Sequence, residues 1–270
     1  MMRVEAVIFD WAGTTVDHGS LAPVRALTEV FRRQGISVSD ADARKDMGLF
    51  KRDHIASILA MPQIADQWRR THRALPGDAD VDRLFTEFLP EQIKVLDGCG
   101  EVIDGVAEAT SRLRARHLRI GSTTGYTRPM LDVLVARARA QGHETDIALC
   151  PDDVGGGRPH PWMCLQIALA FRVGATAAVI KVGDTVTDID EARNAGMWAV
   201  GVAATGNEIG LSAADLAALT GDERQRRLTI ARERLRAAGA HYVIDSAAAI
   251  EPIVDALDQR LSAGDRPFER

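Results

Sequence analysis

An apolar run near the start of the chain, Ala6 to Phe9, ends at an acidic residue, Asp10, and Trp11 and the small residues Ala12 to Thr15 follow at once. A second apolar run, Ala178 to Val182, ends in the same way at Asp184. Short apolar runs bounded by turn residues are typical of buried strands. Parallel strands end at one edge of a sheet, so we expect the two carboxylates to meet there, where they can hold a divalent cation.

From about residue 100, strand and helix patterns alternate. Repeated strand–helix units predict a parallel sheet covered by helices on both faces. The expected strands span Leu118 to Thr123, Ile147 to Cys150, Ala178 to Val182, Trp198 to Val202 and His241 to Ile244. The expected helices span Val106 to Arg116, Pro129 to Gln141, Pro161 to Phe171, Asp188 to Ala195 and Asp222 to Ala238. We expect the tail, Ser262 to Arg270, to fray.

Between residues 20 and 97 no convincing strand occurs. Apolar residues at helical spacing predict helices instead. The expected helices span Leu21 to Gln34, Ser39 to Lys45, Asp53 to Leu59 and Val81 to Phe88, with a further helix opened by Pro62. The prediction is therefore an α/β protein with a doubly wound, Rossmann-like parallel sheet. Its core would comprise residues 1–20 and 99–270, and a helical cap domain, residues 21–98, would be inserted after the first strand, with hinges near Leu21 and Gly98 to Gly100.

Composition excludes several classes of protein. The chain has 270 residues and a net charge of −5, which argues against a nucleic-acid-binding surface. No apolar run approaches the length of a membrane span, and we expect no signal peptide. The three cysteines, Cys99, Cys150 and Cys164, show no CxxC spacing, so neither a disulfide framework nor a zinc site is expected. These features fit a cytoplasmic protein.

Three further residues fit the chemistry of the two strand-end acids. Thr124 closes the strand that ends at Thr123, Arg158 follows a run of three glycines, and Asp188 lies four residues after Asp184. Together with Asp10 and Asp184 they supply an anionic nucleophile, a hydroxyl donor, a cation and metal ligands. Phosphoryl transfer needs such a set, because positive charge must stabilise the oxygens on phosphorus while the nucleophile attacks in line.

The order of these residues is similar to the four motifs of the haloacid dehalogenase superfamily. Longer segments closely resemble its phosphonoacetaldehyde hydrolase (phosphonatase) family, and the resemblance runs from Val4 to about Gly210. The segments are Asp10–Thr15, Met47–His54, Gly121–Arg128, Pro151–Val154, Gly157–Cys164 and Gly183–Asp188. The first of these, together with the loop that carries Lys51, is specific to this family.

The resemblance implies a role for each matching residue. Asp10 would attack phosphorus and become an aspartyl phosphate. Mg²⁺ would be held by the carboxylates of Asp10 and Asp184 and by the backbone carbonyl of Ala12, with Asp188 in support. Thr124 and Arg158 would bind phosphoryl oxygens beside Gly125. The family also implies a homodimer.

Lys51 has the most specific implied role, which is an imine with the substrate aldehyde. Direct cleavage of a carbon–phosphorus bond would expel a carbanion, whereas a protonated imine lets a neutral enamine leave. The amine must then be partly unprotonated near neutral pH, hence shielded from water. The resemblance makes His54 a proton-transfer helper, while Met47 and Tyr126 are expected to line the pocket.

Ala12 gives independent support. Many phosphatases of this superfamily carry an acid two residues after the nucleophile, which protonates a departing alkoxide. Alanine has no proton to give, and an enamine leaving group needs none at that position. Three residues depart from the family pattern: Ser20 replaces a cysteine, Phe50 a small aliphatic residue and His160 a tyrosine.

Two other functions stay open from the residues alone. The chain could be a phosphatase or phosphomutase acting on a phosphate ester, which Ala12 disfavours. It could also be a non-catalytic protein that retains the pocket and binds a phosphonate. The leading prediction is a Mg²⁺-dependent enzyme that converts phosphonoacetaldehyde and water to acetaldehyde and phosphate.

Overall fold

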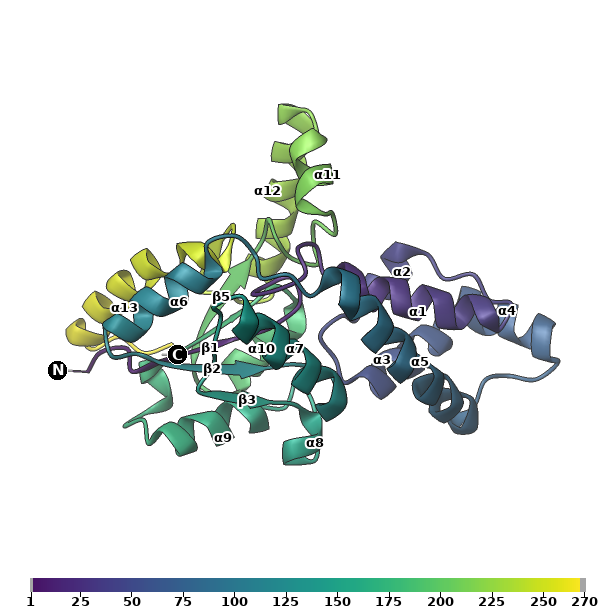
Figure 1. Ribbon diagram of the computed structural model, residues 1–270, viewed down its shortest axis with the longest axis horizontal. Helices are drawn as coiled ribbons and strands as arrows, with labels where there is room; N and C mark the ends of the chain where they lie inside the picture. Colours follow the sequence, from purple (N-terminus) through teal and green to yellow (C-terminus); the bar gives the residue numbers. More distant parts are fainter. Residues whose placement is uncertain (1, 268–270) are drawn as a thin grey trace.

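The computed structural model describes residues 2–267 and contains a six-stranded parallel sheet in the order β3-β2-β1-β4-β5-β6 (Figure 1). The strands are β1 (Ala6–Phe9), β2 (Arg119–Thr123), β3 (Ile147–Leu149), β4 (Val179–Gly183), β5 (Trp198–Val202) and β6 (Tyr242–Ile244). Strand β1 lies between β2 and β4, and the chain adds strands on both sides of it. This confirms the predicted doubly wound α/β architecture.

Helices cover both faces of this sheet. The helices of this part of the chain are α6 (Val106–Ala115), α7 (Arg128–Ala140), α8 (Pro151–Val154), α9 (Trp162–Phe171), α10 (Val186–Asn194), α11 (Ala213–Ala218), α12 (Gly221–Ala237) and α13 (Glu251–Ala263). Of these, α6, α9, α10 and α12 contact the strands directly. In β1, Ala6 and Ile8 pack with α9, whereas Val7 and Phe9 pack on the other face with α6 and α13. Burial on both faces explains why this strand is apolar throughout instead of alternating.

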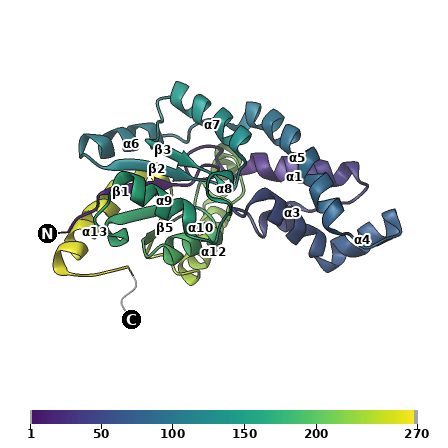
Figure 2. The ribbon, with the colours of Figure 1, turned by 90° about the horizontal axis from the view of Figure 1, so that it is seen from below.

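The remaining helices form a separate bundle next to the carboxyl ends of the strands (Figures 1 and 2). They are α1 (Leu21–Arg33), α2 (Asp40–Arg44), α3 (Lys51–Ala60), α4 (Pro62–His72) and α5 (Asp78–Cys99). Leu27, Phe31, Trp68 and Phe88 are buried in the apolar core of this bundle. We call the bundle the cap; the exact division of the chain at residues 21 and 98 stays a prediction.

Helix α5 is longer than expected, since the prediction covered only Val81 to Phe88. It continues through Pro90, which would normally end a helix. Leu84, Phe88 and Leu96 are all buried at helical spacing, so packing against α1 outweighs the cost of the proline.

The C-terminal region also differs from the prediction. Helices α11 and α13 were not expected, and the predicted fraying from Ser262 is wrong for the start of that tail, because α13 continues to Ala263. Val254, Leu257 and Leu261 hold α13 on the sheet as one buried stripe. Residues 268–270 lie outside the described residues. Within residues 2–267, no helix is both long and apolar enough to span a membrane.

Arg44, the last residue of α2, ties the cap to the core. Its guanidinium donates hydrogen bonds to the carbonyl oxygens of Gly19 (2.9 Å) and Gly210 (3.2 Å) and to Oδ1 of Asn207 (3.1 Å). The Asn207 amide donates in return to the Arg44 carbonyl oxygen (3.2 Å). We call these hydrogen bonds between Arg44 and the core the clasp. Because the Asn207 backbone N–H donates to Oδ2 of Asp184 (2.7 Å), the clasp is connected to the acid that follows β4.

Replacing Arg44 by Met should loosen this clasp. The change removes charge-assisted hydrogen bonds worth ~1–3 kcal/mol in total, so we expect residues 17–21 and 203–211 to exchange their amide hydrogens about tenfold faster or more. Hydrogen–deuterium exchange followed by mass spectrometry measures this. Arg70→Met, at an exposed site on α4, is the control. Equal exchange in wild type and Arg44→Met would contradict the assignment of Arg44 as a clasp.

Candidate active site

Polar side chains follow three adjacent strands at the edge of the sheet that the cap covers (Figure 2). Asp10 follows β1, Thr124 follows β2 and Asp184 follows β4. All three side chains are buried. The structure therefore brings together the strand-end residues that the sequence analysis expected to meet.

The turn after β1 is packed tightly against Asp184. Gly13 has a φ of +82°, and a Cβ there would lie 2.3 Å from Oδ2 of Asp184, so only glycine fits. The hydroxyl of Thr14 donates to Oδ1 of Asp184 (2.9 Å). This packing explains the run of small residues after Asp10.

Asp10, Asp184 and Asp188 form one acidic cluster, with a ligand atom of each within 4.8 Å of the others. Burial raises the pKa of Asp10, and the charge of Asp188 adds to this shift. Burial also raises the pKa of Asp184 well above its usual value, and the charge of Asp10 contributes. Burial opposes ionisation of Asp188 as well, but the charges of Arg158 and Lys181 outweigh it and lower the pKa of that carboxyl.

This cluster fits a divalent cation. Asp184 has no cationic side chain within ion-pair distance among the described residues, and its negative charge is disfavoured by that of Asp10. Buried carboxylates arranged in this way are the oxygen ligands that such cations prefer. Asp188 suits the supporting role predicted for it, because Oδ1 already pairs with Lys181 (2.7 Å) and Arg158 (3.0 Å). A ligand role for the Ala12 carbonyl stays a prediction.

Arg158 is buried at the centre of the site. Its Nη2 donates to Oδ1 of Asp10 (2.7 Å) and to the carbonyl oxygen of Thr123 (2.9 Å), and its Nε donates to Oε2 of Glu191 (2.9 Å). Burial opposes its charge, but the charges of Asp188 and Asp10 outweigh this and hold the pKa of Arg158 well above its usual value. These contacts indicate that Arg158 holds Asp10, the predicted nucleophile, in place.

Lys51 is the first residue of α3 and only 2% exposed. Its Nζ lies 3.6 Å from Sδ of Met47 and 5.4 Å from the centre of the Tyr126 ring. Burial lowers the pKa of Lys51 to about 8; the charge of Asp10 works against this shift and that of Arg158 adds to it. The positive end of the α3 helix dipole further disfavours an ammonium group there.

Most of the predicted site residues line one small cavity of about 20 Å³, enough for roughly one water molecule. The cap supplies one wall and the strand ends supply the other. The lining residues are Asp10, Ala12, Ser20, Pro23, Met47, Gly48, Lys51, Thr124, Gly125, Tyr126, Arg158 and Thr185.

His54, like Asp184 and Asp188, is a predicted site residue that does not line this cavity. Burial, together with the neighbouring charge of Lys51, lowers the pKa of His54 well below its usual value. Neither ring nitrogen has a side-chain hydrogen-bond partner within residues 2–267. His54 is thus a neutral imidazole one helical turn behind Lys51, and its proton-transfer role stays a prediction.

The three departures from the family pattern lie in different places. Ser20 lines the cavity. Phe50 packs edge-on against Phe85 in the cap, with ring centres 5.5 Å apart. His160 stacks on Trp162 at 4.3 Å, outside the cavity. Of the three, Ser20 is therefore the one placed to touch a ligand.

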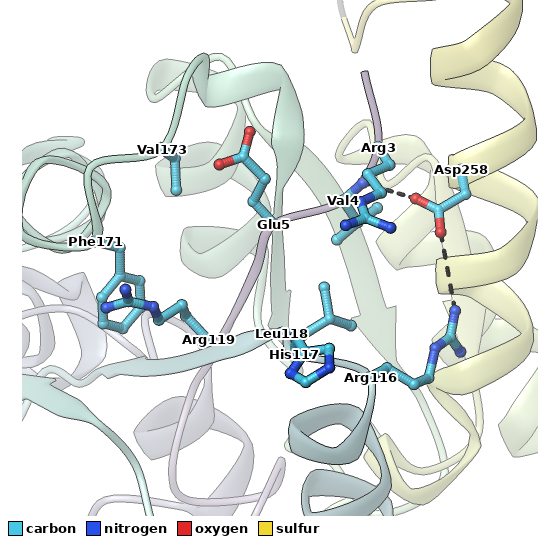
Figure 3. Close-up of a pocket in the computed structure, with 10 residues that line it drawn as sticks. All are labelled: Arg3, Val4, Glu5, Arg116, His117, Leu118, Arg119, Phe171, Val173 and Asp258. Carbon is cyan, nitrogen blue, oxygen red and sulfur yellow. Dashed lines mark hydrogen bonds and ion pairs between the residues drawn. The ribbon is translucent and has the colours of Figure 1, made fainter. Parts of the chain in front are cut away.

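A larger cavity, about 390 Å³, lies at the opposite edge of the sheet, where β1 and β2 begin (Figure 3). Arg116 pairs there with Asp258 (3.9 Å), and the guanidinium of Arg119 lies 5.6 Å from the centre of the Phe171 ring. Its lining contains neither a lysine that could form an imine nor the acidic cluster. We therefore assign the active site to the smaller cavity.

The sequence analysis missed four residues that support the site: Arg44, Asn207, Lys181 and Glu191. Lys181 carried a signal, since it is a charged residue inside an otherwise apolar strand. Glu191 lies one helical turn beyond Asp188, on the same side of α10. Arg44 and Asn207 gave no signal, because their contact depends on how the cap meets the core.

Comparisons with known proteins agree with this geometry. The sequence profile of the haloacid dehalogenase-like hydrolases matches residues 4–196. Proteins named phosphonoacetaldehyde hydrolase are 43% identical over 265 residues in Nitratidesulfovibrio vulgaris (98% of this chain, 95% of that one) and 44% identical over 261 residues in Bacillus cereus (96% and 98%). A crystal structure of a phosphonoacetaldehyde hydrolase-like protein from Oleispira antarctica superposes with a TM-score of 0.96 at 41% identity, over 98% of this chain and 96% of that one.

The fold and its acidic strand-end site thus define a hydrolase of the haloacid dehalogenase-like class. Within that class, the chain belongs to the phosphonoacetaldehyde hydrolase family, as its motifs predicted.

Gly125→Ala should prevent the cap from closing. A Cβ at this position would lie 2.3 Å from the carbonyl oxygen of Leu49 and 2.7 Å from that of Gly48, so the loop before Lys51 must move away. A displacement of this kind should lower kcat/KM about a hundredfold. Steady-state kinetics measures the effect. Gly77→Ala is the control, because a Cβ there meets nothing within 4 Å; equal kinetics for both variants would contradict the argument.

Lys51→Met should stabilise the protein at neutral pH. The pKa of Lys51 falls from 10.5 to about 8 on folding. Its burial therefore costs ~3 kcal/mol below pH 8, and the cost disappears as pH rises through 8 towards 10.5. Urea unfolding in metal-free buffer should show a gain of about 1–3 kcal/mol at pH 7 that shrinks by pH 10. Exposed Lys94→Met should show no such pH-dependent gain, and a gain for Lys51→Met that is constant with pH would contradict the cause.

Proposed function

We propose that the protein hydrolyses phosphonoacetaldehyde to acetaldehyde and phosphate through an imine on Lys51 and an aspartyl phosphate on Asp10. The observation that carries this proposal is that the Lys51 amine and the Asp10 carboxylate, both buried, line the same small cavity. An ordinary phosphatase needs no buried amine there. The names of the relatives, which share more than two fifths of their residues with this chain, point to the same substrate.

The amine acts first. With a pKa of about 8, a sizeable fraction of Lys51 is neutral near physiological pH and can attack the aldehyde carbon, releasing water. The protonated imine that results withdraws electrons from the carbon attached to phosphorus. Met47 and Tyr126 surround Nζ with apolar groups and hold it in this place.

The carboxylate acts second. An oxygen of Asp10 attacks phosphorus, the carbon–phosphorus bond breaks, and its electron pair moves to the imine to give a neutral enamine. Arg158 holds Asp10 in one orientation, and Thr124 and Gly125 form the wall where the phosphoryl oxygens would lie. Water then hydrolyses the aspartyl phosphate, while protonation and hydrolysis of the enamine return acetaldehyde and the free amine.

Mg²⁺ is the cation we propose for the acidic cluster, held by Asp10 and Asp184 with the Ala12 carbonyl. When bound, it would supply positive charge that offsets the repulsion between Asp10 and the substrate dianion. The charges of Asp10 and Asp184 favour the protonated form of Lys51. A cation bound to these two carboxylates would offset that effect, so a larger fraction of the Lys51 amine would be neutral.

The cap must open for the reaction to occur. The cavity accommodates about one water molecule, and a phosphonate with a two-carbon chain is several times larger. Closure then excludes water from both reactive groups. The cavity therefore represents a closed form, and the cap gates entry of the substrate.

An assay for acetaldehyde release tests the proposal. Purified protein with Mg²⁺ and phosphonoacetaldehyde should release acetaldehyde and phosphate in equal amounts, and Lys51→Arg and Asp10→Ala should lower the rate by about three orders of magnitude or more. Borohydride added with substrate should attach the two-carbon unit to Lys51, visible by mass spectrometry. Absence of that adduct during turnover would remove the imine from the mechanism.

The same assay separates the alternatives. Fast turnover of a sugar phosphate without phosphonate cleavage would indicate a phosphate-ester enzyme, and binding without phosphate release would indicate a phosphonate-binding protein. A homodimer and a cytoplasmic location are further proposals from the family resemblance. Sedimentation analysis tests the first, and cell fractionation tests the second.

A further inference from the structure

Two buried charged residues at the active site have no role in the proposed reaction. Lys181 lies on β4 and Glu191 on α10, and both side chains have 0% exposure. Buried charges cost several kcal/mol unless good partners offset the loss of water. Neither residue lines the cavity, so neither can touch the substrate. Their partners therefore indicate what they do.

Glu191 acts on the site through Arg158. Its Oε2 accepts hydrogen bonds from Nε of Arg158 (2.9 Å) and from the hydroxyl of Thr123 (3.0 Å). That hydroxyl oxygen in turn accepts from Nη2 of Arg158 (2.8 Å). One edge of the guanidinium is thus fixed to two rigid elements, α10 and β2.

The rest of the guanidinium faces the acids of the site. Nη2 donates to Oδ1 of Asp10 (2.7 Å), and Nη1 lies 3.0 Å from Oδ1 of Asp188. A guanidinium is planar, so all of these contacts exist together only in one orientation of the Arg158 plane. Fixing the Nε edge through Glu191 selects that orientation.

Lys181 balances the charge of this arrangement. Its Nζ lies 2.7 Å from Oδ1 of Asp188 and 3.6 Å from Oε2 of Glu191. Arg158 and Lys181 together thus face Asp10, Asp188 and Glu191. Without Lys181, Arg158 alone would have to compensate three buried carboxylates.

We propose that Glu191 is a positioning residue: through Nε it fixes the plane of Arg158, and Arg158 then holds the attacking carboxylate of Asp10 in line. This inference rests on the proposed function, in which Asp10 is the nucleophile. The essential feature is the hydrogen-bond acceptor at Oε2. The other oxygen, Oε1, has no hydrogen-bond partner among the described residues, so Oε2 accepts both of the hydrogen bonds described above.

The test compares Glu191→Ala with Glu191→Gln. Gln keeps an acceptor for Arg158 and Thr123, whereas Ala removes it. We expect kcat of Glu191→Ala to fall about 10–100-fold, with KM within about threefold of wild type. We expect Glu191→Gln to stay within about threefold of wild type in kcat, which is rescue by the conservative variant. Glu251→Ala, which removes a partly exposed ion pair with Arg112 (2.5 Å) between α13 and α6, outside the cavity lining, is the control and should leave kcat unchanged.

Crystal structures of both variants give a readout that does not depend on activity. The contact between Nη2 of Arg158 and Oδ1 of Asp10 should be lost in Glu191→Ala and kept in Glu191→Gln. If Glu191→Ala fails to fold, Thr123→Val removes the bridging hydroxyl at nearly constant volume, and its kcat should fall about tenfold.

Three results would overturn the inference: wild-type kcat in folded Glu191→Ala or in Thr123→Val, an unchanged Arg158–Asp10 contact in Glu191→Ala, or equal losses in the Ala and Gln variants. If the wild-type protein releases no acetaldehyde, the proposed function fails instead. In that case the crystal structures still decide whether Glu191 holds Arg158 on Asp10.

Discussion

The contact between Gly125 and the loop before α3 is the constraint on which the rest of the site depends. A Cβ on residue 125 would overlap the carbonyl oxygens of Gly48 and Leu49, so only a bare backbone lets the loop come so near the end of β2. This approach buries Lys51 over the strand ends. A solvated lysine would be almost fully charged at neutral pH. The lowered pKa of Lys51 is therefore a property of the closed contact between cap and core, not of the residue alone.

When the cap closes, the Lys51 amine comes next to charged side chains whose positions are set within the core. Four buried carboxylates, those of Asp10, Asp184, Asp188 and Glu191, face two buried cations in the core, Arg158 and Lys181. The excess negative charge lies near Asp184, the carboxylate without a cationic partner among the described residues, which is where a divalent cation fits. The ion pairs on the other side of Asp10 hold that carboxylate in place. One cluster thus separates into a part that suits a metal ion and a part that positions Asp10.

Part of the fold and of the site could be predicted from the sequence, and the rest could not, for physical reasons. Residues at strand ends could be predicted to meet, because parallel strands end at one edge whatever the helices between them do. The length of α5 could not be predicted, since packing of its buried face outweighs the cost of placing Pro90 inside a helix. The clasp formed by Arg44 and the contact of Glu191 with Arg158 could not be predicted either, because the partners are far apart in sequence. The residues around each partner do not indicate such a contact.

The closure that buries the amine has opposing contributions. Buried carboxylates and a buried amine destabilise the closed form, whereas apolar contacts stabilise it, because cap residues and core residues such as Trp11, Met130 and Leu134 belong to one buried apolar cluster. Hydrogen bonds such as those of Arg44, and that of the Thr187 hydroxyl to the Met47 carbonyl oxygen (3.0 Å), hold the two parts together. Each contributes about 1 kcal/mol, so the apolar contacts of α5 with α7 are the larger obstacle to opening. A still more extensive apolar interface would exclude water equally well but would also exclude the substrate.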